Sequence, residues 1–273
     1  MLKFYPYMYP TLHLGPFSLS THTLLNVAAG SVAFAGIWWR SRHATLPRNF
    51  SDLIDIFFHV LIGGCLGAWL AASLPSLFHY LSGDTSYQRW WASGNQWMGV
   101  LAGSSLATYW YYRRRGLPYT QAFEVSAPLI PLVQAVGRVG CLLHGDAYGR
   151  PATGWPAMLL PDVNGVWVSR YPTQLVDILA NLVIFFLLLL VERLAIQRTG
   201  RPGGWPFEGF TFLVYIILYS IQRSIFEFWR GDMPLFYSAL TWTHFYCAIA
   251  ILLALWGIAR GFRQRTLHTY STP

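Results

Sequence analysis

Residues 122–143 of the chain are AFEVSAPLIPLVQAVGRVGCLL, and they lead directly into HGDAYGR at residues 144–150. The first segment is apolar over 22 residues, which is enough for a helix to cross a bilayer. Its end and the following turn, residues 137–150, hold two arginines, a histidine, an aspartate, a cysteine and four glycines. Charged groups are costly in hydrocarbon, so they normally face a cavity or one another and mark a function. We therefore expect the rest of the chain to be a scaffold around this segment.

The composition of the chain indicates a membrane protein. Of its 273 residues, 54% are hydrophobic and only 11% are charged, whereas about a quarter of the residues in a soluble domain are charged. Aromatic residues make up 17%, including 13 tryptophans, which suits the belts that such side chains form at membrane interfaces. The net charge is +8, but most arginines directly follow apolar runs, which indicates membrane topology and no nucleic-acid partner.

Seven apolar runs are long enough to span a bilayer. They lie near residues 21–39, 52–74, 95–112, 122–143, 174–192, 208–229 and 236–259. The odd-numbered runs are followed by arginines: Arg40, Arg42, Arg48, Arg113, Arg114, Arg115, Arg193, Arg198, Arg201, Arg260, Arg263 and Arg265. The positive-inside rule makes that side cytoplasmic. The predicted fold is therefore an all-α polytopic membrane protein of about seven transmembrane helices, with the N-terminus outside and the C-terminus in the cytoplasm.

The chain contains no internal repeat and no second soluble segment, so residues 1–273 are expected to form a single transmembrane domain. Two external loops, residues 75–94 and 144–173, are expected to contribute a small cap. Pro128 and Pro131 are expected to kink the fourth helix ahead of its polar end. No two cysteines have metal-binding spacing, so neither a metal site nor a cofactor is predicted.

Polar residues concentrate near the outer ends of several runs. They are His22 in the first run, Arg138, Cys141, His144 and Asp146 at the end of the fourth, Gln174 at the start of the fifth, Tyr219, Arg223, Glu227 and Arg230 in the sixth, and His244 in the seventh. Those of the sixth run recur every three or four residues, so they share one helix face. The sequence therefore predicts a polar site at one depth, in the outer leaflet or just below it.

Arginines on two different helices, Arg138 and Arg223, suit an anionic headgroup, because guanidinium binds phosphate bidentately and stays charged. A lipid phosphate from the outer leaflet is the ligand that we expect. The simpler alternative for the sixth run is that Arg223 only forms an ion pair with Glu227 and binds no lipid. For Arg230 we favour a structural role. For Arg138 we favour a functional role, because no acidic residue lies at helical spacing from it.

The histidine of the central segment is ambiguous by itself, because a neutral interfacial histidine is the commoner case. The closeness of His144 to Asp146 and Arg138 in the sequence favours an acid–base role, since histidine is the usual proton carrier near neutral pH. Cys141 is expected to be a small apolar residue.

Three segments resemble motifs of the prolipoprotein diacylglyceryl transferases of the bacterial cytoplasmic membrane. Residues 137–150 resemble the family signature, roughly G-R-x-G-N-x-x-N-x-E-x-x-G. Residues 172–177, PTQLVD, resemble P-S-Q-L-Y-E, and residues 219–232, YSIQRSIFEFWRGD, resemble Y-x-x-x-R-x-x-x-E-x-x-R. The order of the elements and the predicted topology match that family along nearly the whole chain.

The resemblance implies a specific activity. Such enzymes transfer the diacylglyceryl group of phosphatidylglycerol to the lipobox cysteine thiol of a preprolipoprotein and release glycerol phosphate. By position, Arg138 and Arg223 would be the essential arginines and Gly149 the essential glycine. The resemblance further implies a multi-pass protein of the bacterial inner membrane, with membrane lipid around it and the active site toward the outer leaflet.

The chain also departs from the family pattern. Met98 stands where the family has a histidine in the third span, and His22 stands where it has a tyrosine in the first. Cys141 and His144 replace the two signature asparagines, and Asp146 replaces the glutamate. Without the family histidine the usual base is missing, so His22 or His144 is a candidate to replace it.

Two alternatives therefore remain beside lipoprotein modification. The first is the same lipid donor chemistry on another acceptor, a hydroxyl or amine of a different protein, glycan or lipid. The second is a non-catalytic lipid-binding membrane protein of the same fold, since a fold alone does not guarantee an activity.

Overall fold

The structure is a computed structural model that describes residues 11–15, 17–41, 49–92, 96–162, 164–200, 203–231 and 240–270. Some sequence predictions fall outside these residues: Arg42, Arg48, Arg201, the start of the last run at 236–239, and residues 93–94 and 163 of the two predicted external loops. The described chain is mostly helical, in line with the predicted class.

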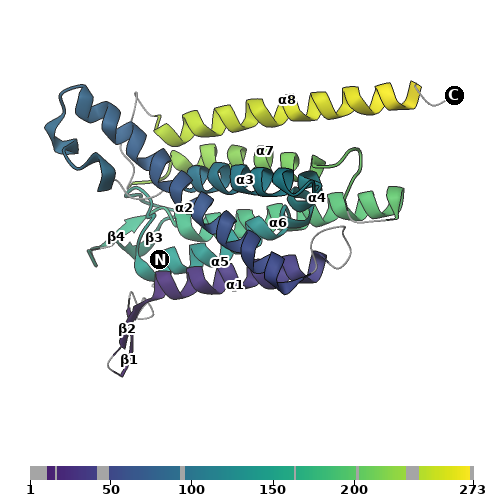
Figure 1. The fold of residues 1–273 in the computed structure, drawn as a ribbon. Coiled ribbons are helices and arrows are strands. Elements are labelled where there is room, and N and C mark those ends of the chain that lie inside the picture. The colour runs from purple at the N-terminus through teal and green to yellow at the C-terminus, as the bar shows by residue number, and fades with distance from the viewer. Residues whose placement is uncertain are drawn as a thin grey trace. The chain divides into compact units, whose positions relative to one another are not determined.

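The elements follow one another along the chain as Figure 1 shows. The helices are α1 (Thr21–Ser41), α2 (Phe50–Leu81), α3 (Trp97–Arg114), α4 (Tyr119–Ser126), α5 (Leu129–His144), α6 (Thr173–Thr199), α7 (Phe210–Glu227) and α8 (Trp242–Tyr270). Two antiparallel hairpins, which the sequence analysis did not predict, consist of β1 (Thr11–Leu14) with β2 (Phe17–Ser20) and of β3 (Met158–Pro161) with β4 (Trp167–Arg170). Helix α2 is longer than the second run and takes up the first part of the predicted 75–94 loop.

Among the described residues, four helices are long and apolar enough to cross a membrane, namely α2, α6, α7 and α8. Helices α4 and α5 make a fifth candidate if they count as one broken span. Helices α1 and α3 have 21 and 18 residues, but polar side chains such as Asn26, Ser104 and Thr108 lie along them. The chain is thus a multi-pass helical membrane protein, with four or five candidate spans in its described part, which does not confirm the seven predicted.

The predicted break in the fourth run is confirmed, and it occurs at Ala127 and Pro128, between α4 and α5. Pro128 occupies the cap position of α5, and Pro131 lies in its first turn. The backbone amides of a first turn have no partner within the helix, so proline is tolerated there. Of the two prolines, Pro128 therefore marks the break.

The chain divides into two compact units, residues 38–125 and residues 1–37 together with 126–273. In the first of these, α2 and α3 pack closely through glycines. A Cβ at Gly63 or Gly67 would collide with backbone atoms of Gly103 or Gly99, and the reverse also holds. Both helices thus carry a small-xxx-small pattern, which lets backbones approach closely in membranes.

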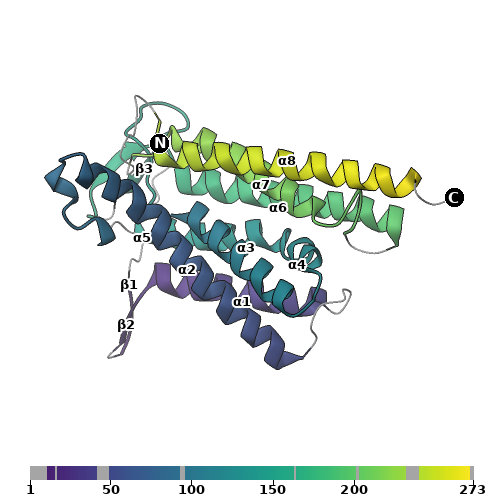
Figure 2. The same ribbon diagram turned by 45° about the horizontal axis from the view of Figure 1, so that its top comes forward.

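In the other unit, α5 packs against α6, α6 against α7, and α7 against α8. Figures 1 and 2 show α6, α7 and α8 running side by side. The first part of α1 lies along α5, because the position of a Cβ at Gly140 is 3.2 Å from Leu25 Cβ and 3.3 Å from His22 Cα. The described residues of the predicted polar site all belong to this unit.

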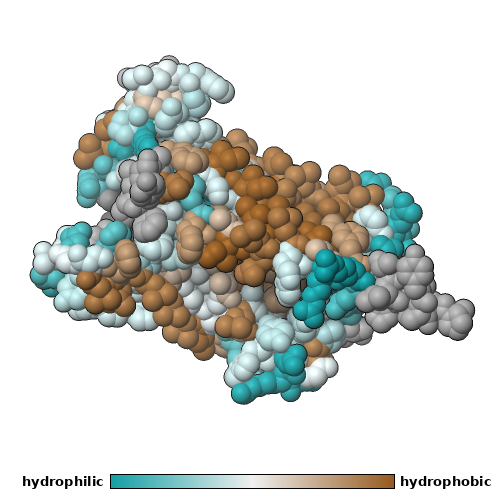
Figure 3. All heavy atoms as spheres, turned by 90° about the horizontal axis from the view of Figure 1, so that it is seen from above, coloured by the Kyte–Doolittle hydropathy of each residue, from teal (hydrophilic) through white to brown (hydrophobic). Residues whose placement is uncertain are grey.

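Large apolar side chains point outward along the spans. Leu179 and Phe186 of α6 and Leu252, Leu253 and Trp256 of α8 are all exposed. Figure 3 shows hydrophobic side chains gathered in one broad area of the visible face, with hydrophilic ones toward its ends. Such a surface suits contact with hydrocarbon, which needs no polar groups to satisfy.

Candidate functional site

Helix α5 ends in a turn that folds the chain back on the helix. Gly145 has φ 84°, the left-handed conformation that glycine adopts at the end of many helices. The amides of Gly145 and Asp146 both donate to the Cys141 carbonyl oxygen, at 2.9 and 3.1 Å. The turn thereby brings the Asp146 side chain beside the last turn of α5.

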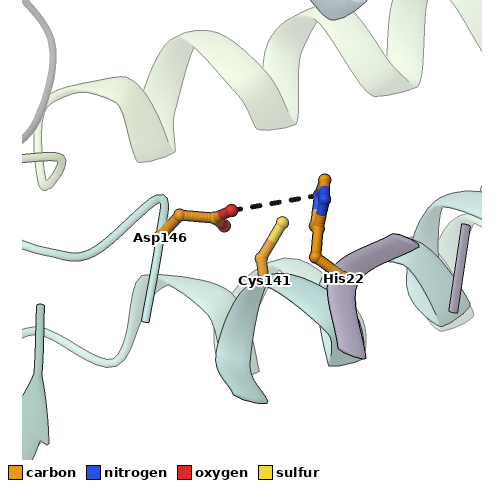
Figure 4. A group of neighbouring side chains, drawn as sticks. All are labelled: His22, Cys141 and Asp146. Carbon is orange, nitrogen blue, oxygen red and sulfur yellow. Dashed lines mark ion pairs between the residues drawn. The ribbon is translucent and has the colours of Figure 1, made fainter. Parts of the chain in front are cut away.

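Three predicted site residues meet at this turn, as Figure 4 shows: His22 from α1, Cys141 from α5 and Asp146. His22 Nε2 lies 3.9 Å from Asp146 Oδ2, and the donor atoms of the three side chains all lie within 4.8 Å of one another. His144 Nδ1 lies 3.5 Å from the same Asp146 oxygen. A histidine, a thiol and a carboxylate so close together could exchange protons or hold a metal ion.

Two polar atoms of this group are buried without a hydrogen-bond partner among the described residues, His144 Nδ1 and Asp146 Oδ1. Buried polar groups nearly always have partners, so each exception calls for an explanation. The histidine of α1 is itself held by Asn26, whose Nδ2 lies 3.3 Å from both ring nitrogens of His22. The group is therefore partly positioned by protein contacts and partly open to a ligand.

Arg138 forms an ion pair that the sequence analysis did not predict. Its Nε lies 3.0 Å from Oδ2 of Asp177 in α6, and both side chains are largely buried. The other carboxylate oxygen of Asp177 accepts a hydrogen bond from Gln222 Nε2 of α7 at 3.1 Å. Arg138 Nη1 also points at Cys141 Sγ, 3.8 Å away. This arginine therefore connects the α5–α6–α7 packing with the group at the turn.

Arg223 and Glu227 form the predicted intrahelical ion pair, with Nη2 and Oε2 2.6 Å apart and both side chains buried. The second oxygen of Glu227 accepts a hydrogen bond from Thr241 Oγ1 at 2.9 Å. Arg223 Nη1, in contrast, is buried and has no hydrogen-bond partner in the described part of the chain. Tyr219 interacts electrostatically with the guanidinium groups of both Arg223 and Arg138. One face of α7 thus carries a cation with an unsatisfied donor.

The segment after the turn is held tightly by backbone contacts. Gly149 forms a β-bridge with Arg230, and the Gly231 amide donates to the Tyr148 carbonyl at 3.0 Å. On its other side, Gly149 is so close to Tyr171 that an added Cβ would overlap its carbonyl oxygen. The segment therefore lies between the end of α7 and the start of α6 with no room for a side chain at position 149.

Gln174 and His244 both form hydrogen bonds with backbone atoms of the protein. Gln174 Nε2 donates to the Asp146 carbonyl at 2.8 Å, so it positions the turn. His244 Nδ1 accepts from the Thr241 amide at 3.1 Å, and its ring lies 4.5 Å from the Phe228 ring. His244 therefore caps the first turn of α8.

Known proteins identify the family of this chain. The family model described as prolipoprotein diacylglyceryl transferase matches residues 10–260. The chain belongs to the prolipoprotein diacylglyceryl transferase family. A relative from Nitratidesulfovibrio vulgaris (strain DP4) is 30% identical over 257 residues, which are 91% of this chain and 92% of the relative. One from Pseudomonas fluorescens (strain SBW25) is 25% identical over 265 residues, 93% of this chain and 92% of the relative. Both are named phosphatidylglycerol--prolipoprotein diacylglyceryl transferase.

In this prolipoprotein diacylglyceryl transferase family member, four of the residues that depart from the family pattern lie together. His22, Cys141, His144 and Asp146 all belong to the group at the end of α5. His22 lies 119 positions before Cys141, so no sequence spacing reveals that it joins the other three. Among the residues that follow the family pattern, Arg138 and Arg223 are paired with carboxylates.

Gln222 and Thr241 were not predicted as site residues, and Asp177, the last residue of the PTQLVD motif, was not given a partner. Asp177 pairs with Arg138, Gln222 donates to the other carboxylate oxygen of Asp177, and Thr241 donates to Glu227. Asp177 carried the only available signal, because a carboxylate in an apolar run needs a partner. The sequence does not show that this partner is Arg138, because the two residues lie 39 positions apart in the chain.

Proposed function

We propose that this protein transfers the diacylglyceryl group of phosphatidylglycerol to the lipobox cysteine thiol of a preprolipoprotein and releases glycerol phosphate. The observation that carries the proposal is the family match over residues 10–260. The two relatives described above, which align with more than nine-tenths of the chain, carry the name of this reaction. The buried Arg138 and Arg223 support it, because the reaction needs cations where a phosphate departs.

Arg223 and Arg138 hold the phosphate of the lipid in this proposal. Arg223 Nη1 supplies a buried donor that lacks a partner among the described residues. Arg138 is paired with Asp177 through Nε, and of its terminal nitrogens Nη1 lies 3.8 Å from Cys141 Sγ. Donors that are fixed before the reaction stabilise charge that develops on the leaving group. Tyr219 and Glu227 on the same face of α7, and Arg230 just after the end of this helix, are the substrate-binding neighbours.

The nucleophile of this reaction is a thiolate, so a group must take the proton of the acceptor thiol. His144 is the first candidate, because its Nδ1 is unpartnered in the described structure and lies 3.5 Å from the Asp146 carboxylate. A carboxylate beside a histidine orients the ring for proton transfer. His22, which contacts the same carboxylate, is the second candidate.

The placement in the cell follows from the same proposal. The protein lies in the bacterial inner membrane with about seven spans, the N-terminus outside and the C-terminus in the cytoplasm. The site opens toward the outer leaflet, and residues 75–94 and 144–173 contribute a cap to a single transmembrane domain. The arginines after the odd-numbered runs support this orientation.

The experiment that tests the proposal is a transfer assay on the purified protein in detergent. It uses phosphatidylglycerol with a labelled diacylglyceryl group and a peptide that carries a lipobox cysteine. We expect label on the cysteine, and a loss of about 100-fold or more for Arg223→Lys, which keeps the charge but loses the planar donor array. Arg115→Lys is the matched control, because Arg115 is half-exposed and pairs with aspartates outside this site.

Two results separate the alternatives. Release of glycerol phosphate only after membrane extract is added would mean that the donor chemistry is intact but that the acceptor is another molecule. Binding of the lipid without release under either condition would contradict any transferase and would favour a lipid-binding protein.

A further inference from the structure

We propose that His22, Cys141 and Asp146 form a binding site for a divalent transition-metal ion of the Zn²⁺ class. The three donors are an imidazole nitrogen, a thiol sulfur and a carboxylate oxygen, and they lie within 4.8 Å of one another. They come from α1, from α5 and from the turn after α5, as Figure 4 shows. The role of this ion in catalysis, described below, rests on the proposed function, but the site itself does not.

The distances fit a metal site that closes by a small movement. Zn²⁺ binds nitrogen, oxygen and sulfur ligands at about 2.0–2.3 Å, so tetrahedral ligands lie about 3.3–3.8 Å from one another. His22 Nε2 and Asp146 Oδ2, 3.9 Å apart, nearly meet this value. No separation among the three donor atoms exceeds 4.8 Å, so each must shorten by at most about 1 Å, which rotation of the Cys141 or His22 side chain supplies.

The chemistry of the donors selects the kind of ion. Thiolate and imidazole prefer Zn²⁺ and its neighbours, whereas Mg²⁺ and Ca²⁺ require oxygen ligands. One thiolate and one carboxylate together neutralise a divalent cation, so the bound group has no net charge to bury. Arg138 Nη1, 3.8 Å from Cys141 Sγ, is placed to donate to a metal-bound thiolate.

A second, independent observation points to a ligand at this place. Asp146 Oδ1 is buried and has no hydrogen-bond partner among the described residues, and the same holds for Nδ1 of the neighbouring His144. Two buried polar atoms without partners within one small group are unusual in a folded protein. A metal ion that carries a water molecule would satisfy both.

Three protein ligands leave one coordination position open, the arrangement of a catalytic metal site. The acceptor cysteine would bind there through its sulfur. Coordination removes the thiol proton, which passes to solvent. The sulfur then forms a bond to the terminal glyceryl carbon of the lipid, and the bond from that carbon to the phosphate oxygen breaks. Glycerol phosphate leaves with the bonding electron pair, held by Arg223 and Arg138.

The first test measures metal binding without activity. The full-length protein, purified in detergent, is stripped with a chelator and then titrated with Zn²⁺ or with Co²⁺, whose visible and near-ultraviolet absorption reports tetrahedral geometry and a thiolate ligand. We expect one ion per chain, a higher unfolding temperature with Zn²⁺ and no effect of Mg²⁺. Cys141→Ser and His22→Gln should each raise the Kd for Zn²⁺ by about 100-fold. Cys141→Ser should also remove the thiolate band from the Co²⁺ spectrum.

Cys65→Ser is the matched control, because Cys65 is an exposed free cysteine in the other compact unit. It should retain the stoichiometry, the Kd and the Co²⁺ spectrum. Unfolding of each chelator-stripped variant checks that a loss of binding is not a loss of folding. An absence of Zn²⁺ binding in folded wild-type protein, or a Co²⁺ spectrum that Cys141→Ser leaves unchanged, would overturn the proposal.

The transfer assay separates this proposal from the proposed function. A stripped protein that transfers label at the full rate refutes the metal's role and leaves the transferase intact. A protein that binds one Zn²⁺ through Cys141 but never labels the lipobox peptide keeps the metal site and contradicts the proposed acceptor. Loss of transfer on stripping, with recovery after one equivalent of Zn²⁺, supports both.

Discussion

Replacing Gly149 with alanine should destabilise the protein strongly, although it adds a single methyl group. The added Cβ would overlap the Tyr171 carbonyl oxygen and would lie 2.9 Å from Tyr171 Cβ. Carbon atoms at their best separation are about 3.5 Å or more apart, so the chain must move by about 0.6 Å or more. It cannot simply move away, because the position of a Cβ on Gly231 is already 3.1 Å from the Gly149 carbonyl oxygen.

The magnitude follows from the contacts that such a movement breaks. Overpacking in a tight site costs about 1–3 kcal/mol. The movement also stretches backbone hydrogen bonds on both sides of the segment, from Arg150 N to Trp229 O at 2.8 Å and from Tyr171 N to Arg150 O at 3.1 Å. Each is worth about 1 kcal/mol. We therefore expect Gly149→Ala to lower the free energy of unfolding by about 3–5 kcal/mol.

Gly30→Ala is the matched control for this change. Gly30 lies within α1, and an added Cβ would have no other atom within 4 Å. Alanine in a helix is about 0.5–1 kcal/mol more stable than glycine, so this variant should be unchanged or slightly stabilised. The assay is unfolding in mixed detergent micelles with increasing denaturing detergent, followed by tryptophan fluorescence.

The same two variants should differ in the transfer assay. The segment with Gly149 leads from the turn that carries Asp146 to the bridge with Arg230, so its displacement moves both ends of the site. We expect at least a tenfold loss of transfer for Gly149→Ala and none for Gly30→Ala. If the two variants unfolded at the same detergent fraction and transferred label equally, the inferred tight packing of this segment would be wrong.

Three further changes test other parts of the structure. Asp177→Asn removes the charge opposite Arg138, and leaving a buried guanidinium unpaired should cost about 3–5 kcal/mol in the same unfolding assay. Gly67→Ile should separate α2 from α3 and lower the unfolding temperature, whereas Gly67→Ala should do so less. Hydrogen bonds from Ser86 lower the pKa of Asp84 below its usual 3.8. The ionised carboxylate should therefore stabilise this loop above pH 3.8, and this stabilisation should be lost as the pH falls through the lowered pKa. Faster hydrogen exchange of the Ser86 amide at low pH would report the loss.

The helices could be predicted because their signal is local. Apolar runs of about 20 residues form helices in a membrane whatever lies around them, since the backbone must satisfy its own hydrogen bonds there. The break at Pro128 is local too, because a proline in the body of a helix removes one of those bonds and clashes with the preceding turn. The extension of α2 to Leu81 was missed because Pro75 and the polar residues after it suggested a loop.

The contacts of the site could not be predicted, because they join distant parts of the chain. The partner of Arg138 was sought at helical spacing, but it lies on α6. The four-residue strands β3 and β4 are too short to show a clear alternation of apolar and polar residues. Cys141 was expected to be a small apolar residue, because nothing in the local sequence places it beside His22.

Arg138 connects the group at the turn with helix α7 through Asp177 and Gln222. Arg138 contacts Asp177 through Nε and points Nη1 at Cys141, so it borders the group of histidines and the carboxylate. Its charge also acts on Tyr219, as does that of Arg223. Transfer between a thiol and a phosphate ester needs the incoming sulfur and the departing oxygen on opposite sides of one carbon atom. In the function proposed above, Arg138 would bind the departing phosphate close to the incoming sulfur, because its Nη1 lies 3.8 Å from Cys141 Sγ. The buried pairing with Asp177 then has a purpose beyond stability, since it holds the guanidinium in one orientation before either substrate arrives.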